Sequence, residues 1–304
     1  MLRTLIINQK IEPFKKIIKV DGDKSLSIRW VLLASQALGS SKAYNLLMSE
    51  DVNAALGAIK KLGIKVKINK GNCEIFGNGI NGFNYKSGLV VDAKNSGTLG
   101  RLILGLLIRS PKRIKIIGDK SLSKRDFSRV VIPLEKFGAK FYYKKKNKLP
   151  LSVIGSQSPK GINYIENKGS AQCKSSVMLA ALNSTGTTFI KAKKSRNHSE
   201  LLFKYLKIPI KIKKNKKYDF INIKKPKKIN AFNYQVPGDI SSSAFFMVLT
   251  MLTNNSELLI KNVNINPSRI GIITILKKMG AKIYLKNTRN YRGEKISDIK
   301  IKTS

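Results

Sequence analysis

A short pattern that marks the end of a helix and the start of a strand occurs four times in this chain of 304 residues. In three copies an amphipathic helix is predicted to end at a glycine, Gly63, Gly138 or Gly280, and an alternating strand follows. A degenerate fourth copy places Lys207 at the glycine position, where a left-handed backbone should cost about 1 kcal/mol. The positions lie 75, 69 and 73 residues apart. A period near 70 predicts about four tandem βα units, each with several strands and two helices.

The first of these units shows the helical pattern plainly. Val52, Leu56, Ile59 and Leu62 recur at helical spacing behind Ser49, a candidate N-cap. Such a stripe predicts a helix that buries one face against a sheet. Near the other end of the chain, the turn at residues 236–239 precedes a further apolar helix, and we place a domain boundary close to it, at Pro237.

The composition is strongly basic, with 59 Lys and Arg against 17 Asp and Glu, a formal net charge of +42. This balance raises the possibility of nucleic-acid binding. The charge is nevertheless spread along the chain, and its dense runs adjoin β-like stretches, which favours solvated hairpin ends. A general positive field that attracts small polyanions is the simpler interpretation. The dense runs are residues 144–148, 213–217 and 224–228.

Two cysteines, a single histidine and no CxxC spacing argue against a disulfide framework and against a metal site. The longest apolar run, Leu102 to Ile108, is too short to cross a bilayer, and no signal-peptide core is visible at the N-terminus. These features predict a cytoplasmic protein without a membrane partner.

An octapeptide occurs twice, at residues 22–29 and 118–125, with seven of eight positions identical. Each copy combines a glycine turn, a lysine, a hydroxyl at a predicted helix start and an arginine. Backbone N–H groups at a helix N-terminus and fixed cations together favour an anionic ligand. The alternative is a pair of ordinary N-caps provided by Ser25 and Ser121.

Two further segments resemble ligand-binding turns at helix starts. Residues 95–101 form a Gly-Thr turn before an apolar helix, where Gly97 permits close approach of a ligand, although such a turn is also common without one. Residues 169–176 open another apolar helix with small polar side chains. Cys173 is predicted to pack as a small core residue. His198 is predicted to form local hydrogen bonds at a helix start rather than act as a base.

In this order the motifs closely resemble those of the 5-enolpyruvylshikimate-3-phosphate synthase (3-phosphoshikimate 1-carboxyvinyltransferase) family, over essentially the whole chain. The segments that carry the resemblance are residues 22–29, 95–98, 118–125, 170–172, 195–200 and 236–242.

The resemblance implies an α/β enolpyruvyl transferase fold with two domains, each of three βα units around a pseudo-threefold axis. It assigns residues 20–237 to a complete three-unit domain on the shikimate 3-phosphate side. Residues 1–19 and 238–304 are then an incomplete second domain, because the family's catalytic aspartate segment would lie beyond Ser304. We therefore expect this chain alone to be inactive, and we expect the second domain to expose apolar residues of one helix. These residues are Phe245, Phe246, Val248 and Leu249.

The resemblance also implies the reaction. The 5-hydroxyl of shikimate 3-phosphate adds to C2 of phosphoenolpyruvate, C3 is protonated, and the tetrahedral intermediate loses phosphate, a step of aromatic amino acid biosynthesis that glyphosate inhibits. No cofactor or metal is implied. By resemblance Lys24 is catalytic, and the residues that bind shikimate 3-phosphate are Lys24, Ser25, Arg29, Ser170, Ala171, Gln172 and Arg196. Those that bind phosphoenolpyruvate are Lys24, Gly97, Arg125 and Gln172.

Two alternatives compete with this interpretation. UDP-N-acetylglucosamine enolpyruvyl transferases are similar in fold, but typically carry Lys-Asn at the first turn and a reactive loop cysteine. This chain has Lys24-Ser25 and no cysteine in residues 118–125. The second alternative is a basic nucleic-acid-binding protein, whose binding would survive saturation with shikimate 3-phosphate. We expect a monomer whose partners are the two small-molecule substrates.

Overall fold

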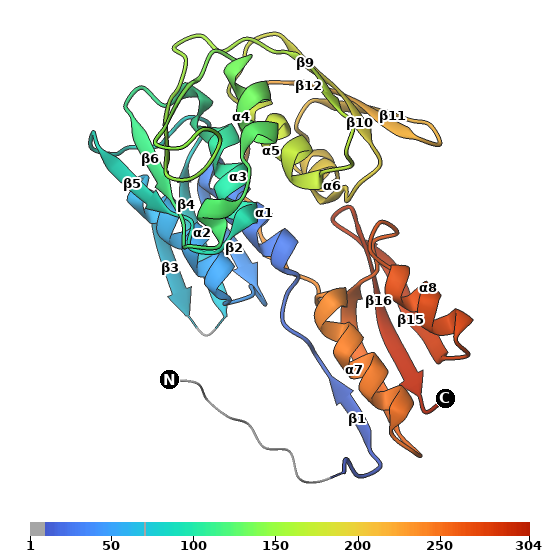
Figure 1. Ribbon diagram of the computed structural model, residues 1–304. Helices are drawn as coiled ribbons and strands as arrows, with labels where there is room; N and C mark the ends of the chain where they lie inside the picture. The colour runs from blue at the N-terminus through green and yellow to red at the C-terminus, as the bar shows by residue number, and fades with distance from the viewer. Residues whose placement is uncertain (1–9, 70) are drawn as a thin grey trace. The chain divides into compact units, whose positions relative to one another are not determined.

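A computed structural model describes residues 10–69 and 71–304 of the protein (Figure 1). Contacts divide the chain into a larger domain, Gly22–Val236, and a smaller domain made of residues 10–21 and 237–304. The first nine residues, which the sequence assigned to the second domain, lie outside the described residues.

One group of elements recurs four times: a first helix, a strand, a second helix and a β-hairpin. We call this group the αβαββ repeat, and its recurrence confirms the tandem units predicted from the period near 70. The first repeat is α1 (Lys24–Ser35), β2 (Leu38–Tyr44), α2 (Glu50–Lys61), β3 (Lys65–Asn69) and β4 (Asn72–Asn78). The second is α3 (Gly97–Leu106), β6 (Ile114–Ile117), α4 (Ser128–Glu135), β7 (Lys140–Tyr143) and β8 (Leu151–Ile154), with short 3₁₀ turns η1 (Leu107–Arg109) and η2 (Leu122–Lys124). The third is α5 (Ala171–Ala181), β10 (Thr187–Lys193), α6 (His198–Tyr205), β11 (Ile210–Lys214) and β12 (Tyr218–Lys224). The fourth is α7 (Ile240–Leu252), β14 (Glu257–Asn264), α8 (Gly271–Lys278), β15 (Lys282–Tyr291) and β16 (Glu294–Lys302).

Every repeat forms a four-stranded sheet of the same topology. The repeat's three strands pair antiparallel, and a fourth strand joins the edge parallel to the repeat's first strand. The added edge strands are β5 (Leu89–Asp92), β9 (Asn163–Glu166), β13 (Tyr234–Gln235) and β1 (Lys15–Ile18). The sheet orders are β13-β2-β4-β3, β5-β6-β8-β7, β11-β12-β10-β9 and β1-β14-β16-β15.

Two of the edge strands are exchanged between the domains. In the second and third repeats the edge strand immediately precedes the repeat that it joins, as β5 does with β6 and β9 with β10. By that rule β1 would pair with β2, and β13 with β14. Instead β1 pairs with β14, and β13 pairs with β2. The chain therefore crosses from one domain to the other after β1 and again after β13.

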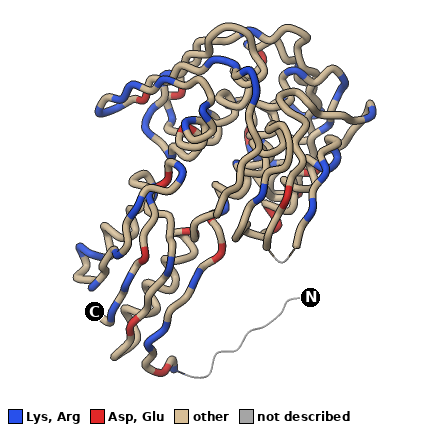
Figure 2. The backbone as a smooth tube through the Cα atoms, turned by 180° about the vertical axis from the view of Figure 1, so that it is seen from behind, with Lys and Arg blue, Asp and Glu red and all other residues tan. Residues whose placement is uncertain are grey.

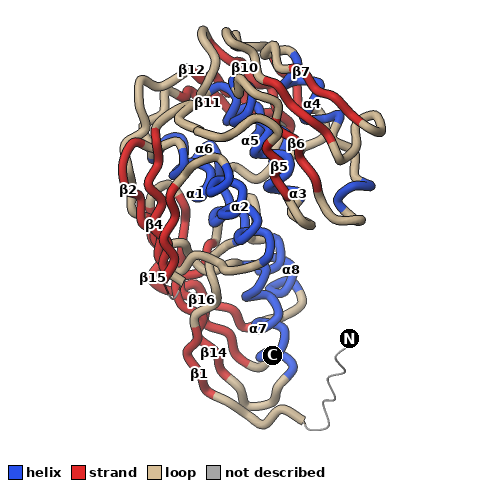
Figure 3. The backbone as a smooth tube through the Cα atoms, turned by 90° about the vertical axis from the view of Figure 1, so that its left-hand side faces the viewer, coloured by secondary structure: helices blue, strands red, loops and turns tan. Residues whose placement is uncertain are grey.

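The first helices of the three repeats in the larger domain form its core. Nearly every residue of α1, α3 and α5 is buried, including the only tryptophan, Trp30. Figure 3 shows the strands of this domain outside its helices. The sequence stripe on α2 is confirmed, because Val52, Leu56, Ile59 and Leu62 are all buried. Helix α3 contacts both α1 and α5, and Arg29 on α1 reaches Ser175 on α5.

Each second helix ends as the sequence pattern predicted. Gly63, Gly138 and Gly280 follow α2, α4 and α8 with φ of 85°, 95° and 92°. Lys207 adopts φ of 55° after α6, so the degenerate copy keeps the left-handed conformation. The Lys207 N–H donates to the Lys204 carbonyl and the Ile208 N–H to the Phe203 carbonyl, the paired bonds of a Schellman motif.

Replacing Lys207 with glycine should raise the free energy of unfolding of the larger domain by about 0.5–1 kcal/mol, since glycine relieves the side-chain clash of the left-handed region. Greater freedom of the unfolded chain offsets part of the gain. Urea denaturation followed by Trp30 fluorescence measures the change. Gly280→Lys in the smaller domain should have the opposite sign in calorimetry, because its φ is left-handed too. A Lys207→Gly variant no more stable than the parent would contradict the strain argument.

The core of the smaller domain lies between its sheet and helices α7 and α8, with Met247, Leu258, Ile260 and Ile273 among its buried residues. One face of α7 stays exposed and apolar, as the sequence predicted: Phe245, Phe246, Val248 and Leu249 are 79%, 41%, 38% and 37% exposed.

Two of the lysine runs lie at hairpin ends, as the sequence predicted, and the third, residues 224–228, begins at the end of β12. Residues 144–148 connect β7 to β8, and residues 213–217 span the β11–β12 turn. Figure 2 shows Lys and Arg along both domains rather than in one stripe. Within the described residues, no helix has the length and apolar character needed to cross a membrane.

Candidate functional site

The first helices of the larger domain each begin at a side-chain cap. Asp23 accepts from the Leu26 N–H at 2.9 Å, Ser96 from the Leu99 N–H at 3.2 Å, and Ser170 from the Cys173 N–H at 3.2 Å. Each cap satisfies one N–H, and the helix dipole leaves partial positive charge at the same end. The aspartate, and not Ser25, therefore caps α1, which leaves the Ser25 hydroxyl outside the capping role.

The second copy of the octapeptide differs in structure from the first. The Leu122 N–H donates to Asp119 at 2.6 Å, so an aspartate caps this copy as well and Ser121 does not. The segment then forms only the 3₁₀ turn η2, and Arg125 follows it in an extended conformation. The expectation of a helix start at this copy is therefore wrong. The Gly-Asp cap itself recurs at Asp239, which accepts from the Ser241 N–H at the start of α7.

Side chains join the first turns of α3 and α5. The Gln172 amide donates to Thr98 Oγ1 at 3.0 Å, and its oxygen accepts from Arg101 Nη1 at 2.9 Å. A Cβ added at Gly97 would lie 2.8 Å from Arg101 Nη1 and 3.0 Å from Arg125 Nη1. The structure thus brings together three residues that the resemblance assigns to phosphoenolpyruvate: Gly97, Arg125 and Gln172.

This cluster is strongly cationic. Burial lowers the pKa of the Arg101 guanidinium below its ordinary value, and the positive charges of Arg125 and Arg129 act in the same direction. Like charges gathered at helix N-termini repel one another, and a bound anion relieves that repulsion. The Arg101 guanidinium carbon also lies over the Phe127 ring, 5.1 Å from its centre, and this cation–π contact helps to hold the side chain in place.

Arg29 belongs to α1, and its side chain reaches α5 and α6. Its side chain is buried, and its Nε donates to Ser199 Oγ at 2.8 Å while Nη2 donates to Ser175 Oγ at 3.1 Å. Its Nη1 donates to the Ser25 carbonyl at 3.0 Å. Arg29 therefore links the first octapeptide to α5, the helix that carries Gln172 in its first turn.

The other predicted residues lie at the starts of the same helices. Lys24 is the first residue of α1, exposed, and pairs with Asp51 at 3.4 Å. Ala171 is the first residue of α5. Arg196 is exposed in the segment before α6, the helix that carries Ser199. Gly97, Arg125 and Gln172 thus form one group, and Arg29 with Ser25 forms a second one at the start of α1.

Sequence reasoning missed the residues that connect these groups. Arg101 and Thr98 stand inside the Gly-Thr motif but were not proposed as part of the site. Spacing could have indicated Arg101, which follows Gly97 by one helical turn. Ser175 and Ser199 lie inside candidate segments, but nothing in the sequence linked them to Arg29, which is 146 and 170 residues away.

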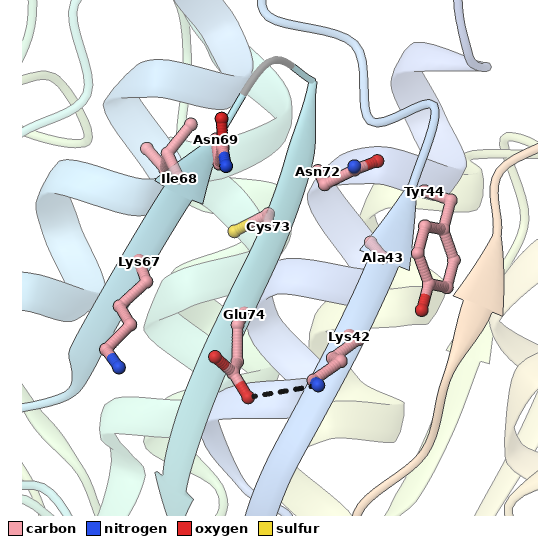
Figure 4. A pocket seen from close by; sticks show the side chains of 9 residues that line it. All are labelled: Lys42, Ala43, Tyr44, Lys67, Ile68, Asn69, Asn72, Cys73 and Glu74. Carbon is pink, nitrogen blue, oxygen red and sulfur yellow. Dashed lines mark ion pairs between the residues drawn. The ribbon is translucent and has the colours of Figure 1, made fainter.

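Other features of the described residues offer less chemistry. A cavity of about 300 Å³ adjoins strands β2, β4 and β3, where Lys42 pairs with Glu74 at 3.7 Å (Figure 4). Burial raises the pKa of Cys73 in this cavity to about 12, so its thiol stays protonated at neutral pH. Cys173 is buried, as predicted for a core residue. No cluster of His, Cys, Asp or Glu suited to a metal ion occurs in the described residues.

Comparison with known proteins identifies the family. The model for EPSP synthase (3-phosphoshikimate 1-carboxyvinyltransferase) matches residues 8–304. The chain belongs to the EPSP synthase family. Curated relatives named 3-phosphoshikimate 1-carboxyvinyltransferase include one from Thermoanaerobacter sp. (strain X514), 40% identical over 95% of this chain and 67% of its own length. Another, from Ruthia magnifica subsp. Calyptogena magnifica, is 42% identical over 94% of this chain and 65% of its own length.

Solved structures agree. EPSP synthase from Acinetobacter baumannii is 35% identical, with a TM-score of 0.87, over 96% of this chain and 65% of the other chain. The chain thus spans about two thirds of the length of the EPSP synthases that it matches. The predicted enolpyruvyl transferase fold is confirmed, and the relatives' names do not favour the UDP-amino sugar alternative.

Proposed function

We propose that this chain provides the binding groups for shikimate 3-phosphate and phosphoenolpyruvate in the transfer of the enolpyruvyl group to the 5-hydroxyl of shikimate 3-phosphate, with release of phosphate. The observation that carries the proposal is the cluster at the starts of α3 and α5, where Gly97, Arg125 and Gln172 lie together, with Arg29 joining α1 to α5. Such an arrangement suits ligands that bring several anionic groups together. We place the activity in the cytoplasm and expect a monomer.

In this proposal one group of residues binds shikimate 3-phosphate and another binds phosphoenolpyruvate. Lys24, Ser25, Arg29, Ser170, Ala171, Gln172 and Arg196 bind shikimate 3-phosphate, and Lys24, Gly97, Arg125 and Gln172 bind phosphoenolpyruvate. Fixed cations lower the cost of bringing the two anions into contact before the carbon–oxygen bond forms. Arg101 supports the residues that bind phosphoenolpyruvate, because it donates a hydrogen bond to Gln172 and adds its positive charge beside Arg125.

Titration calorimetry of the chain with shikimate 3-phosphate tests the proposal. We expect Lys24→Ala to weaken binding about tenfold, the loss of one hydrogen bond to a charged group. Lys42→Ala is a matched control, because Lys42 is equally exposed in the same domain and also forms one surface ion pair. It should bind as tightly as the parent chain.

Equal weakening by both substitutions would contradict the site and would indicate a general positive field. Absence of binding by the parent chain would overturn the proposed substrate. Titration of the chain with an oligonucleotide, in saturating shikimate 3-phosphate, tests the nucleic-acid alternative. That alternative requires the oligonucleotide to bind under these conditions. The spread of cations over both domains gives that alternative no local support (Figure 2).

A further inference from the structure

The guanidinium of Arg29 has one edge turned towards the protein. That edge, formed by Nε and Nη2, is the fork that usually binds the two oxygens of a carboxylate. Here its two N–H groups donate to Ser199 Oγ and Ser175 Oγ. The two hydroxyl oxygens lie 2.7 Å apart and share a hydrogen bond, so they form a pair of acceptors that matches the fork.

Both acceptors are neutral, which distinguishes them from a carboxylate in the same position. A carboxylate would orient Arg29 but would also cancel much of its positive charge. Hydroxyl groups orient the fork and add no negative charge. The charge of Arg29 then remains effective at the start of α1, where Lys24 and Ser25 lie.

Ser175 lies on α5 and Ser199 on α6, so the distance between the two hydroxyls depends on how these helices are held together. The residues beside them form an ion pair: Lys174 on α5 and Glu200 on α6, with N···O of 2.5 Å and both side chains buried. The adjacent links Lys174–Glu200 and Ser175–Ser199 join α5 to α6 at one level. The ion pair therefore holds the two hydroxyls at the spacing that the fork of Arg29 requires.

We propose that Ser175 and Ser199, spaced by the Lys174–Glu200 ion pair, are positioning residues that orient the Arg29 guanidinium for an anionic substrate without neutralising its charge. The identity of that substrate rests on the proposed function. The positioning itself is a property of the chain.

A double-mutant cycle tests the proposal by calorimetry with shikimate 3-phosphate. We expect Ser175→Ala combined with Ser199→Ala to weaken binding about tenfold. In an Arg29→Ala background the same pair of substitutions should have no further effect. Ser184→Ala is the matched control, since Ser184 is also buried and its hydroxyl donates to a backbone carbonyl, that of Ala181. Its binding should equal that of the parent.

Two variants separate positioning from a merely structural role. Ser199→Thr keeps the hydroxyl and should bind shikimate 3-phosphate as the parent chain does. Ser199→Asp should abolish binding, because the aspartate can still accept from the fork but neutralises the charge of Arg29. Equal weakening by the serine substitutions with and without Arg29, or tight binding by Ser199→Asp, would overturn the proposal.

A measurement without ligand separates this inference from the proposed function. The Nε–H of Arg29 should give a slowly exchanging NMR signal in the parent chain, and the signal should exchange rapidly in the double serine variant. If shikimate 3-phosphate does not bind the parent, the substrate is wrong, and the exchange rate still decides the positioning. Unchanged exchange in the double variant would refute it.

Discussion

Replacing Lys174 with methionine should lower the free energy of unfolding of the larger domain by about 3–5 kcal/mol, because it leaves a buried carboxylate without its cation. Lys174 is fully buried, and the Glu200 side chain is only 5% exposed. The second carboxylate oxygen of Glu200 has no hydrogen-bond partner among the described residues, so the carboxylate depends on Lys174. Urea denaturation followed by the fluorescence of buried Trp30 in α1 reports on this domain.

The double variant Lys174→Met with Glu200→Leu provides the control. Removing both charges avoids the uncompensated carboxylate, so most of the lost stability should return. A single variant that is as stable as the double variant would show that the ion pair is solvated in solution. Recovery of stability without recovery of substrate binding would further separate the stability of the larger domain from the orientation of Arg29.

Gly105→Ala should destabilise the larger domain by about 2–3 kcal/mol through overpacking of two helices. A Cβ at this position on α3 would lie 2.1 Å from the backbone carbonyl oxygen of Ser176 on α5. Backbone atoms cannot turn aside as a side chain can, so α3 and α5 must separate. Their separation would also disturb the hydrogen bond between Gln172 and Thr98, and binding of phosphoenolpyruvate should weaken along with stability.

Gly57→Ala is the matched control on α2. A Cβ at Gly57 meets no atom within 4 Å, and the residue is exposed within a helix. Alanine there should raise the free energy of unfolding by about 0.5–1 kcal/mol, since it favours the helix and restricts the unfolded chain. The two glycine substitutions should therefore have opposite signs in urea denaturation. A small effect at Gly105 would show that α3 and α5 are packed less closely than the structure indicates.

Local features of this protein could be predicted from its sequence because they depend on neighbouring residues. The helix ends at Gly63 and Lys207 are examples, since a left-handed residue after an amphipathic stripe defines them within about ten positions. The caps were harder to assign. Asp23 and Ser25 are both good capping residues, and only the fold decides that the aspartate accepts the Leu26 N–H.

Contacts between distant segments could not be predicted in this way. The period of the repeat predicts four similar units, but no local pattern indicates that β13 pairs with β2 rather than β14. The candidate site has the same limitation. Arg29, Arg125 and Gly97 were found through motifs. The contact between Ser199 and Arg29 could not be predicted, because it depends on the packing of α6 beside α1.

The exchange of β1 and β13 has a consequence for how the protein is made. A ribosome delivers the chain from the N-terminus, so β2 leaves it 191 residues before its edge partner, as the pairing of Ala43 with Tyr234 shows. The delay is longer for strand β1, because its residue Lys15 pairs with Glu257, which is synthesised 242 residues later. Both nascent edges expose unpaired backbone during this interval, which invites pairing with other chains. We therefore expect the sheets that contain β2 and β1 to stay incomplete until translation has passed Tyr234 and Glu257, so the rate of elongation helps to set the yield of folded protein.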